Sequence, residues 1–390
     1  MNMLRAAAVT IAACVLATGL ARADEVKVGI LVTTSGPYAS WGHEYTQAVD
    51  LYMDQHKAMA GSHHITVLYR DVGGNQPPRA RQLAQELIVR DNVAVLGGLE
   101  FTPTVLAIQD LIDQANIPFV IFNSGTSVVT KKSPLYVRPS FTQWQVAYPL
   151  AQWAAGHNFK RCVTAAADYA PGQDAIDSYK KGFTDAGGTL LGEVRIPLDT
   201  TDFSTYLQRA KDMNPQCVFT FMPLGPMSVG WVKSFHDRGL DKDGIQLFAT
   251  TETQEVDLPA EGDSALGVIT AIHYGPFLDN PTNKAFVAAY KAKYNNELPG
   301  LAAVAAYDGM EIIFHMVEAT NGKRDGKAAI DSIKGYKWKS PRGDMSIDGN
   351  TREAINNIYI RKVVKENGTM FNKEFDVVKN VKEPWHEFNP

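Results

Sequence analysis

Short apolar segments alternate with amphipathic segments along most of this 390-residue chain. The apolar runs at residues 26–31, 65–69 and 119–122 have the length of buried strands, whereas the segment at 79–90 places apolar residues at helical spacing. A chain that alternates in this way builds a mainly parallel sheet with helices on both faces. The same alternation begins again after residue 139, so we predict an α/β protein with two doubly wound parallel sheets.

Two turns of small and hydroxyl-bearing residues lie in the stretch VLGGLEFTPTVLAIQDLIDQANIPFVIFNSGTSVVT, residues 95–130. Thr102-Pro103 begins a predicted helix that continues to residue 115, and Ser124-Gly125-Thr126 follows the next predicted strand. Both turns lie at the carboxyl ends of strands, where open parallel sheets bind ligands, and their backbone N–H groups suit an anion. Either turn alone is best explained as an ordinary helix cap. Two such turns on neighbouring strands predict a shared site.

Residues 1–23 have the pattern of a signal peptide. Arg5 precedes an apolar run at 6–20, and Ala21-Arg22-Ala23 has the small-x-small form of a cleavage site, so we expect cleavage after Ala23. No later stretch has the roughly 18 apolar residues that a membrane span needs. We therefore expect export to the periplasm.

The rest of the chain is too long for a single core, which predicts two domains.

Cys162 and Cys217 are the two cysteines outside the predicted signal peptide. Both stand at the start of similar apolar strands, CVTAAAD and CVFTFMP, so one disulfide is possible in an exported chain. Because neighbouring strands do not guarantee the side-chain geometry of a disulfide, we favour two buried thiols. Neither cysteine has a CxxC partner or a nearby histidine cluster, so we expect no metal and no cofactor.

Signatures of catalysis and of nucleic-acid binding are missing from the sequence. There is no GxSxG, HExxH or GxxxxGK[ST] motif, and no GxGxxG follows a strand, so we expect that the protein is not an enzyme. The formal net charge is −4 and the sequence has no basic run, so we expect no nucleic-acid partner.

Several sequence blocks resemble, in order and spacing, those of a known family. The blocks are VKVGILVTTSGPYASWG, RDVGGNQPPRARQLAQELIVRDNVAVLGG, IPFVIFNSGTS, DYAPGQDAIDSYKKGFTDAGG, PLDTTDFSTYLQRAKDMNPQCVF and AAVAAYDGMEII. They are similar to blocks of the periplasmic solute-binding proteins of ABC importers, in the branch of leucine/isoleucine/valine-binding proteins. The resemblance covers essentially the whole chain after the predicted signal peptide.

The resemblance implies two lobes joined by three hinge crossovers, with the solute enclosed between them. On this basis we place residues 24–139 and 273–335 in lobe 1, and residues 140–272 and 336–390 in lobe 2. It further implies that the lobes close about the hinge when ligand binds, and that the permease subunits of an ABC importer receive the solute. We expect a monomer.

The resemblance also implies which residues bind the solute. Thr102 and the turn Ser124-Gly125-Thr126 match the positions that hold a ligand carboxylate in relatives. Tyr169 matches an aromatic residue of the second lobe that closes over the ligand. Glu252 lies near the position of an acidic residue that pairs with the ammonium group of an amino acid.

The sequence departs from those relatives at Phe101-Thr102-Pro103, where they often have serines, and Phe101 together with Tyr38 and Trp41 makes the predicted cleft more aromatic. We therefore expect a small apolar or aromatic carboxylate as the ligand. If the Glu252 carboxylate points into the cleft, a branched-chain or aromatic amino acid fits better, since an unpaired buried carboxylate is costly. The alternative for the three aromatic residues is packing under the loop, which we favour for Phe101. A sensory ligand-binding protein is the alternative of another class.

Overall fold

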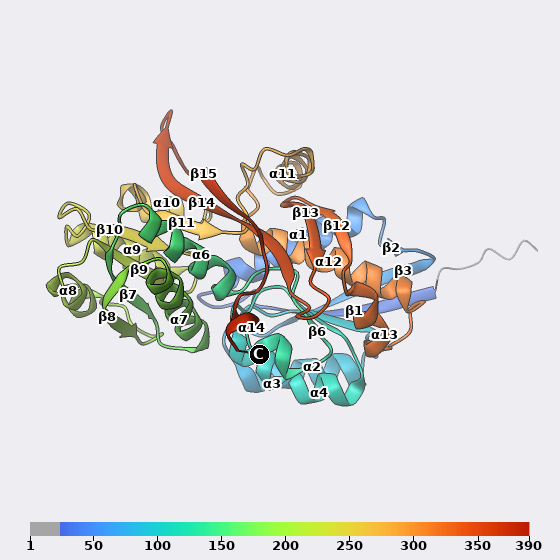
Figure 1. Ribbon diagram of the computed structural model, residues 1–390. Helices are drawn as coiled ribbons and strands as arrows, with labels where there is room; N and C mark the ends of the chain where they lie inside the picture. The colour runs from blue at the N-terminus through green and yellow to red at the C-terminus, as the bar shows by residue number, and fades with distance from the viewer. Residues whose placement is uncertain (1–23, 390) are drawn as a thin grey trace, which may run out of the picture.

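The computed structural model describes residues 24–389, which form two α/β lobes (Figure 1). The predicted signal peptide lies outside the described residues. Each lobe is built on a sheet whose central strands run parallel, as the alternation of strands and helices predicted. The prediction of an α/β fold with two parallel-dominated sheets is therefore confirmed.

Lobe 1 contains a six-stranded sheet in the order β2-β3-β1-β4-β5-β6. Its strands are β1 (Asp24–Val32), β2 (Met59–Ala60), β3 (His63–Asp71), β4 (Val95–Gly98), β5 (Phe119–Ile121) and β6 (Tyr136–Val137). The helices are α1 (Ala39–Gln55), α2 (Pro77–Val89), α3 (Thr102–Ala107), α4 (Gln109–Ala115), α5 (Val129–Lys132), α11 (Pro281–Lys293), α12 (Leu301–Ala319) and α13 (Gly326–Ile333). Strands β4 and β5 are fully buried because they are apolar and lie in the middle of the sheet.

Lobe 2 contains a nine-stranded sheet in the order β12-β13-β14-β11-β10-β9-β7-β8, with β15 paired to β14. Its strands are β7 (Arg161–Ala167), β8 (Thr189–Ile196), β9 (Cys217–Phe221), β10 (Gln246–Ala249), β11 (Ile269–Ile272), β12 (Lys337–Ser340), β13 (Gly343–Ile347), β14 (Ala354–Glu366) and β15 (Thr369–Val381). The helices are α6 (Gln143–Gly156), α7 (Ala170–Asp185), α8 (Ser204–Asp212), α9 (Pro226–Asp237), α10 (Leu258–Glu261) and α14 (Trp385–Phe388), and a 3-10 turn, η1 (Gly262–Ala265), follows α10.

Three segments connect the two sheets. The first runs from β6 to α6, the second from β11 to α11, and the third follows α13 through the β12–β13 hairpin to β14. In Figure 1 the long β14–β15 hairpin passes across the region between the lobes. The division at residues 139/140, 272/273 and 335/336 stays a prediction from the sequence.

Helix α12 packs against α1 through a buried acid. Glu44 of α1 accepts a hydrogen bond from the backbone N–H of Ala303 (2.9 Å), in the first turn of α12, where helical N–H groups lack partners within the helix. Burial raises the pKa of Glu44 to about 7. This acid therefore has a structural role within lobe 1.

Local structure differs from the sequence prediction at three places. The single helix predicted to run to residue 115 is two helices, α3 and α4, which meet at Ile108. Helix α1 spans Ala39–Gln55, whereas the sequence predicted a helix near residues 44–59. Strand β15 was not predicted, because most of its residues are exposed or half-buried and give little alternation of apolar and polar positions.

Cys162 and Cys217 form a disulfide, so the expectation of two buried thiols was wrong. The two residues are direct partners in the parallel pairing of β7 with β9, and their Cα atoms lie 4.6 Å apart. This separation is within the range that a disulfide needs. The sequence placed both cysteines on apolar strands but did not specify that the strands are adjacent and in this register.

Replacing both cysteines, Cys162→Ala with Cys217→Ala, should lower the free energy of unfolding by roughly 2–4 kcal/mol, because the cross-link no longer restricts the unfolded chain. Urea unfolding of the variant and of the oxidised wild type measures the difference. Wild-type protein unfolded in dithiothreitol should lose a similar amount. Two titratable thiols in wild-type protein unfolded without reductant would contradict the assignment.

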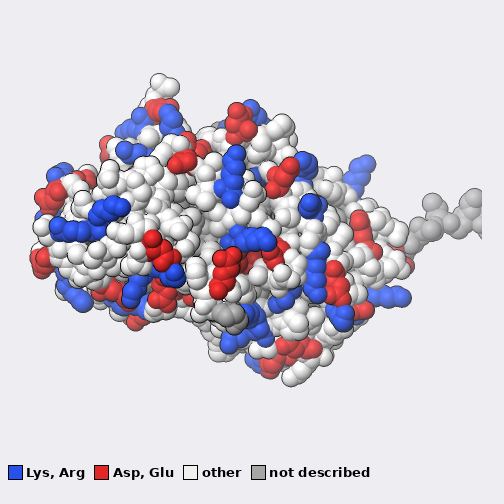
Figure 2. Space-filling model, in the orientation of Figure 1, with Lys and Arg blue, Asp and Glu red and all other residues white. Residues whose placement is uncertain are grey.

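Acidic and basic side chains are intermixed on the face of the molecule shown in Figure 2, with no large area of one sign. Within residues 24–389, no helix combines the length and the apolar character that a membrane crossing requires.

Candidate ligand-binding site

A cavity lies between the lobes, with about 400 Å³ of empty space that is partly open to solvent. Its walls come from both lobes and from the first connecting segment. Lobe 1 and this segment contribute Trp41, Glu100, Phe101, Asn123, Gly125 and Phe141, and lobe 2 contributes Gln143, Tyr169, Pro171, Phe221, Pro223, Leu224 and Thr251. Aromatic and aliphatic side chains predominate, and no lysine, arginine or histidine of residues 24–389 lines the cavity.

The backbone is strained where strands end at the cavity. Leu99 follows β4, Ser124 follows β5 and Thr253 lies beyond β10, and their φ angles are 60°, 61° and 56°. Non-glycine residues rarely adopt this left-handed conformation, and it concentrates at sites that bind ligands. These three positions lie beyond the carboxyl ends of strands, where the sequence predicted a site; twelve other non-glycine residues, nine of them asparagines, share the conformation elsewhere within residues 24–389.

The three predicted hydroxyl residues of lobe 1 lie together. The Thr102 hydroxyl is 3.1 Å from the Ser124 hydroxyl and 2.9 Å from the Thr126 hydroxyl, and all three side chains are buried. Thr102 does not cap its helix, since Phe101 is the N-cap residue of α3. The hydroxyls thus join the start of α3 to the turn at 124–126, while Gly125 of this turn lines the cavity.

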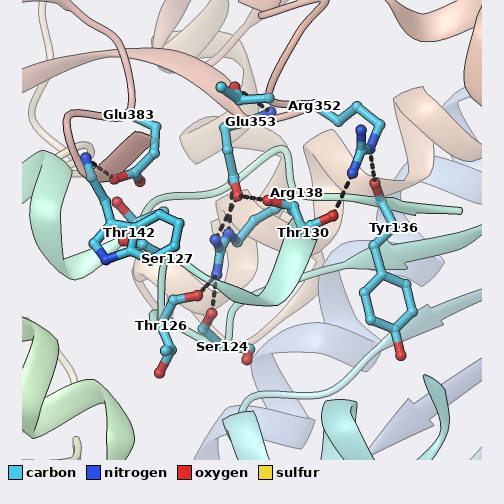
Figure 3. Close-up of polar contacts among 12 residues, drawn as sticks. Ser124, Thr126, Ser127, Thr130, Tyr136, Arg138, Thr142, Arg352, Glu353 and Glu383 are labelled. Atoms are coloured by element: carbon cyan, nitrogen blue, oxygen red, sulfur yellow. Dashed lines mark hydrogen bonds and ion pairs between the residues drawn. The ribbon is translucent and has the colours of Figure 1, made fainter. Parts of the chain in front are cut away.

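Arg138 and Glu353 form a buried ion pair behind the turn at 124–126 (Figure 3). The guanidinium donates from Nε and Nη2 to the two Glu353 carboxylate oxygens, over 2.8 and 2.6 Å. Its Nη1 also donates to the backbone carbonyl oxygens of Ser124 and Thr126. Because a trans peptide places its N–H opposite its C=O, the N–H of Gly125 points away from Arg138.

One backbone N–H of the same region reaches the other lobe. Ser127 donates its amide hydrogen to the Asp174 carboxylate of α7 (2.7 Å). Burial raises the pKa of Asp174 to about 6, although the bond from Ser127 opposes the shift. This contact joins the lobes in the structure.

The aromatic residues of the first loop have different environments. Trp41 is in the first turn of α1, is 5% exposed and lines the cavity, as does Phe101. Tyr38 is half-buried and packs edge-on against Phe101, with ring centroids 5.0 Å apart. Tyr38 is not among the residues that line the cavity.

Tyr169 lies on the wall contributed by lobe 2. It is the N-cap residue of α7, and its ring stacks on Phe221 at the end of β9, with centroids 6.1 Å apart. Both rings line the cavity, as do Trp41 and Phe101 of lobe 1. Each lobe therefore contributes two aromatic side chains to the lining.

Glu252 is fully buried but does not line the cavity. Its carboxylate accepts hydrogen bonds from the backbone N–H groups of Met222 (2.5 Å) and Thr250 (3.1 Å), within lobe 2. Burial raises its pKa to about 8, and these backbone bonds oppose the shift. The structure therefore does not place Glu252 with the other predicted site residues.

Sequence reasoning did not identify Glu100, Asn123 or Gln143, three polar residues that line the cavity. Glu100 and Asn123 follow β4 and β5, so their position at strand ends was a usable signal. Gln143 comes from the start of α6, and its side chain packs on Gly125. No pattern in the sequence marked Gln143.

Buried carboxyl groups should make the folded protein less stable as the pH rises. Burial raises the pKa of Glu252 and Glu261 to about 8, from an ordinary value of 4.5, so the folded state holds protons that the unfolded chain releases. The free energy of unfolding should therefore be greatest near pH 5 and fall toward about pH 8. Urea unfolding across this range measures the slope. Glu261→Gln should reduce the slope by about one proton, and an unchanged slope would contradict the assignment.

Breaking the Arg138–Glu353 pair should be strongly destabilising. Glu353→Leu leaves the Arg138 charge buried without a partner and should lower the free energy of unfolding by about 3–5 kcal/mol. The double variant with Arg138→Met should lose less than Glu353→Leu alone, because no charge remains buried. Equal or greater loss in the double variant would show that the ion pair is not the cause.

Known proteins match this chain over most of its length. The family described as periplasmic binding protein matches residues 25–369. A Leu/Ile/Val-binding protein homolog of Brucella melitensis biotype 1 is 44% identical over 372 residues, which cover 95% of each chain.

Solved structures of similar proteins include complexes with aromatic acids. An ABC transporter solute-binding protein from R. palustris in complex with 4-hydroxybenzoate is 40% identical, with a TM-score of 0.90, and the match covers 94% of this chain and 100% of that chain. One from Rhodopseudomonas palustris BisB5 in complex with 3,4-dihydroxybenzoic acid is 41% identical, with a TM-score of 0.88 and coverage of 93% and 99%. A leucine-binding protein from Thermotoga maritima, 21% identical, shares the fold with a TM-score of 0.80.

Proposed function

Because this chain belongs to the periplasmic binding protein family, as its sequence blocks predicted, we propose that it binds an aromatic carboxylate for an ABC importer. The family and the similar proteins are solute-binding proteins, and the family indicates the periplasm. Cleavage after Ala23, delivery to permease subunits and a monomeric state are parts of the proposal.

The aromatic walls of the cavity carry the proposal. Trp41 and Phe101 of lobe 1 and the stacked rings of Tyr169 and Phe221 of lobe 2 all line the cavity, which suits a flat apolar ring. A ring between these walls removes apolar surface from water on both faces, and closure of the lobes adds the contacts of lobe 2.

We place the carboxylate head at the turn at 124–126. The N–H of Gly125 points away from Arg138, and Asn123 and Gln143 supply amide groups nearby. These neutral donors can hold an anion by hydrogen bonds and peptide dipoles, without a cation in the cavity. Thr102, Ser124 and Thr126 then support the turn through their mutual hydrogen bonds.

A branched-chain or aromatic amino acid is the second candidate ligand. The proposal places it second because the Glu252 carboxylate already accepts two backbone hydrogen bonds within lobe 2. An ammonium group would have to find another acceptor. We retain this candidate because the Brucella relative is named as a Leu/Ile/Val-binding protein homolog.

Isothermal titration of the purified protein with 4-hydroxybenzoate, benzoate, leucine and phenylalanine tests the ligand class. We expect aromatic acids to bind more tightly than both amino acids. Trp41→Ala should weaken binding of the aromatic acids by roughly tenfold or more, because one apolar wall is lost. Trp153→Ala is the matched control, since Trp153 of α6 lies outside the cavity and bonds to Asp376. Tighter binding of leucine than of every aromatic acid would replace the proposal with the second candidate.

A further inference from the structure

Glu100 is a buried acid in the cavity wall whose hydrogen bonding is incomplete. Its side chain is 6% exposed, and Oε1 accepts a hydrogen bond from the Thr33 hydroxyl. Oε2 is buried and has no hydrogen-bond partner among residues 24–389. A buried acceptor without a partner costs free energy that a donor on a ligand would recover.

The bond to Thr33 fixes the side of the sheet to which the Glu100 carboxylate turns. Thr33 follows β1, and Glu100 follows β4, whereas the turn at 124–126 follows β5. The backbone carbonyl of Glu100 accepts a hydrogen bond from the N–H of Ser124 in the turn, but its carboxylate turns the other way, toward Thr33 and β1. The residues that line the cavity therefore include neutral donors toward β5 and, toward β1, an acid with a spare acceptor oxygen.

The charge of Glu100 is compatible with an anionic ligand. Burial raises its pKa to about 7, while the Thr33 hydrogen bond opposes the shift. A carboxyl group that is partly protonated near neutral pH repels a ligand carboxylate less than a permanently charged one would.

We propose that Glu100 accepts a hydrogen bond from a ring hydroxyl of the bound aromatic acid and so selects hydroxylated over unsubstituted benzoates. This inference rests on the proposed function. A ring hydroxyl across the ring from the carboxylate reaches the β1 side of the site while the carboxylate stays at the turn. The ammonium of an amino acid is attached to the carbon next to its carboxylate, so it remains beside the turn.

Titration calorimetry of wild type, Glu100→Leu and Glu100→Gln with benzoate and 4-hydroxybenzoate tests the inference. Wild type should prefer 4-hydroxybenzoate by roughly 10- to 100-fold, the effect of one hydrogen bond to an ionisable partner. Glu100→Leu should lose this preference and bind benzoate at least as tightly as wild type. Glu100→Gln should keep part of the preference, because an amide oxygen still accepts a hydrogen bond.

Glu44→Gln is the matched control, since Glu44 is a buried acid of lobe 1 that also has a pKa raised to about 7 but does not line the cavity. It should leave the ratio of the two affinities unchanged. Equal affinity of wild type for benzoate and 4-hydroxybenzoate, or an unchanged ratio in Glu100→Leu, overturns the inference and leaves the proposed function standing. Failure of wild type to bind either acid overturns the proposed function itself.

Discussion

The buried pair of Arg138 and Glu353 joins two of the three connecting segments at the point where the ligand site is built. The backbones of the two residues form a parallel β-bridge, and their side chains form the ion pair. The two connecting segments are therefore held side by side by both backbone and side-chain contacts. The guanidinium holds the carbonyl groups of the turn at 124–126 behind the cavity wall. The positive charge of Arg138 thus stays behind the cavity wall, while Asn123 and Gln143 line the cavity with neutral amide groups.

Much of the fold was readable from the sequence because the strands are short, apolar and separated by helices at regular intervals. The parallel sheets follow from that pattern. Strand β15 was missed because its stability comes from pairing with β14, and its side chains carry little periodic signal. The disulfide was missed for a related reason, since it depends on the register of β7 and β9, which no local pattern encodes.

The sequence signal for a candidate site was clearest for residues that follow strands. The turns after β4 and β5 were located from hydroxyl and glycine residues, and the structure brings Thr102, Ser124 and Thr126 together. The sequence did not predict the direction in which a side chain points. Glu252 turns into lobe 2, whereas Glu100, two residues before Thr102, lines the cavity. Such choices depend on which backbone N–H groups lie nearby, and tertiary packing sets them.

The Cys162–Cys217 link lies at the base of the strands whose far ends carry Tyr169 and Phe221. Both sulfur-bearing residues are fully enclosed by the folded lobe, so an oxidant cannot reach them after the sheet is covered. The bond therefore forms before or during folding of lobe 2, in a compartment that permits disulfides. With export as proposed, the two strands would be cross-linked at one end as Tyr169 and Phe221 come together at the other.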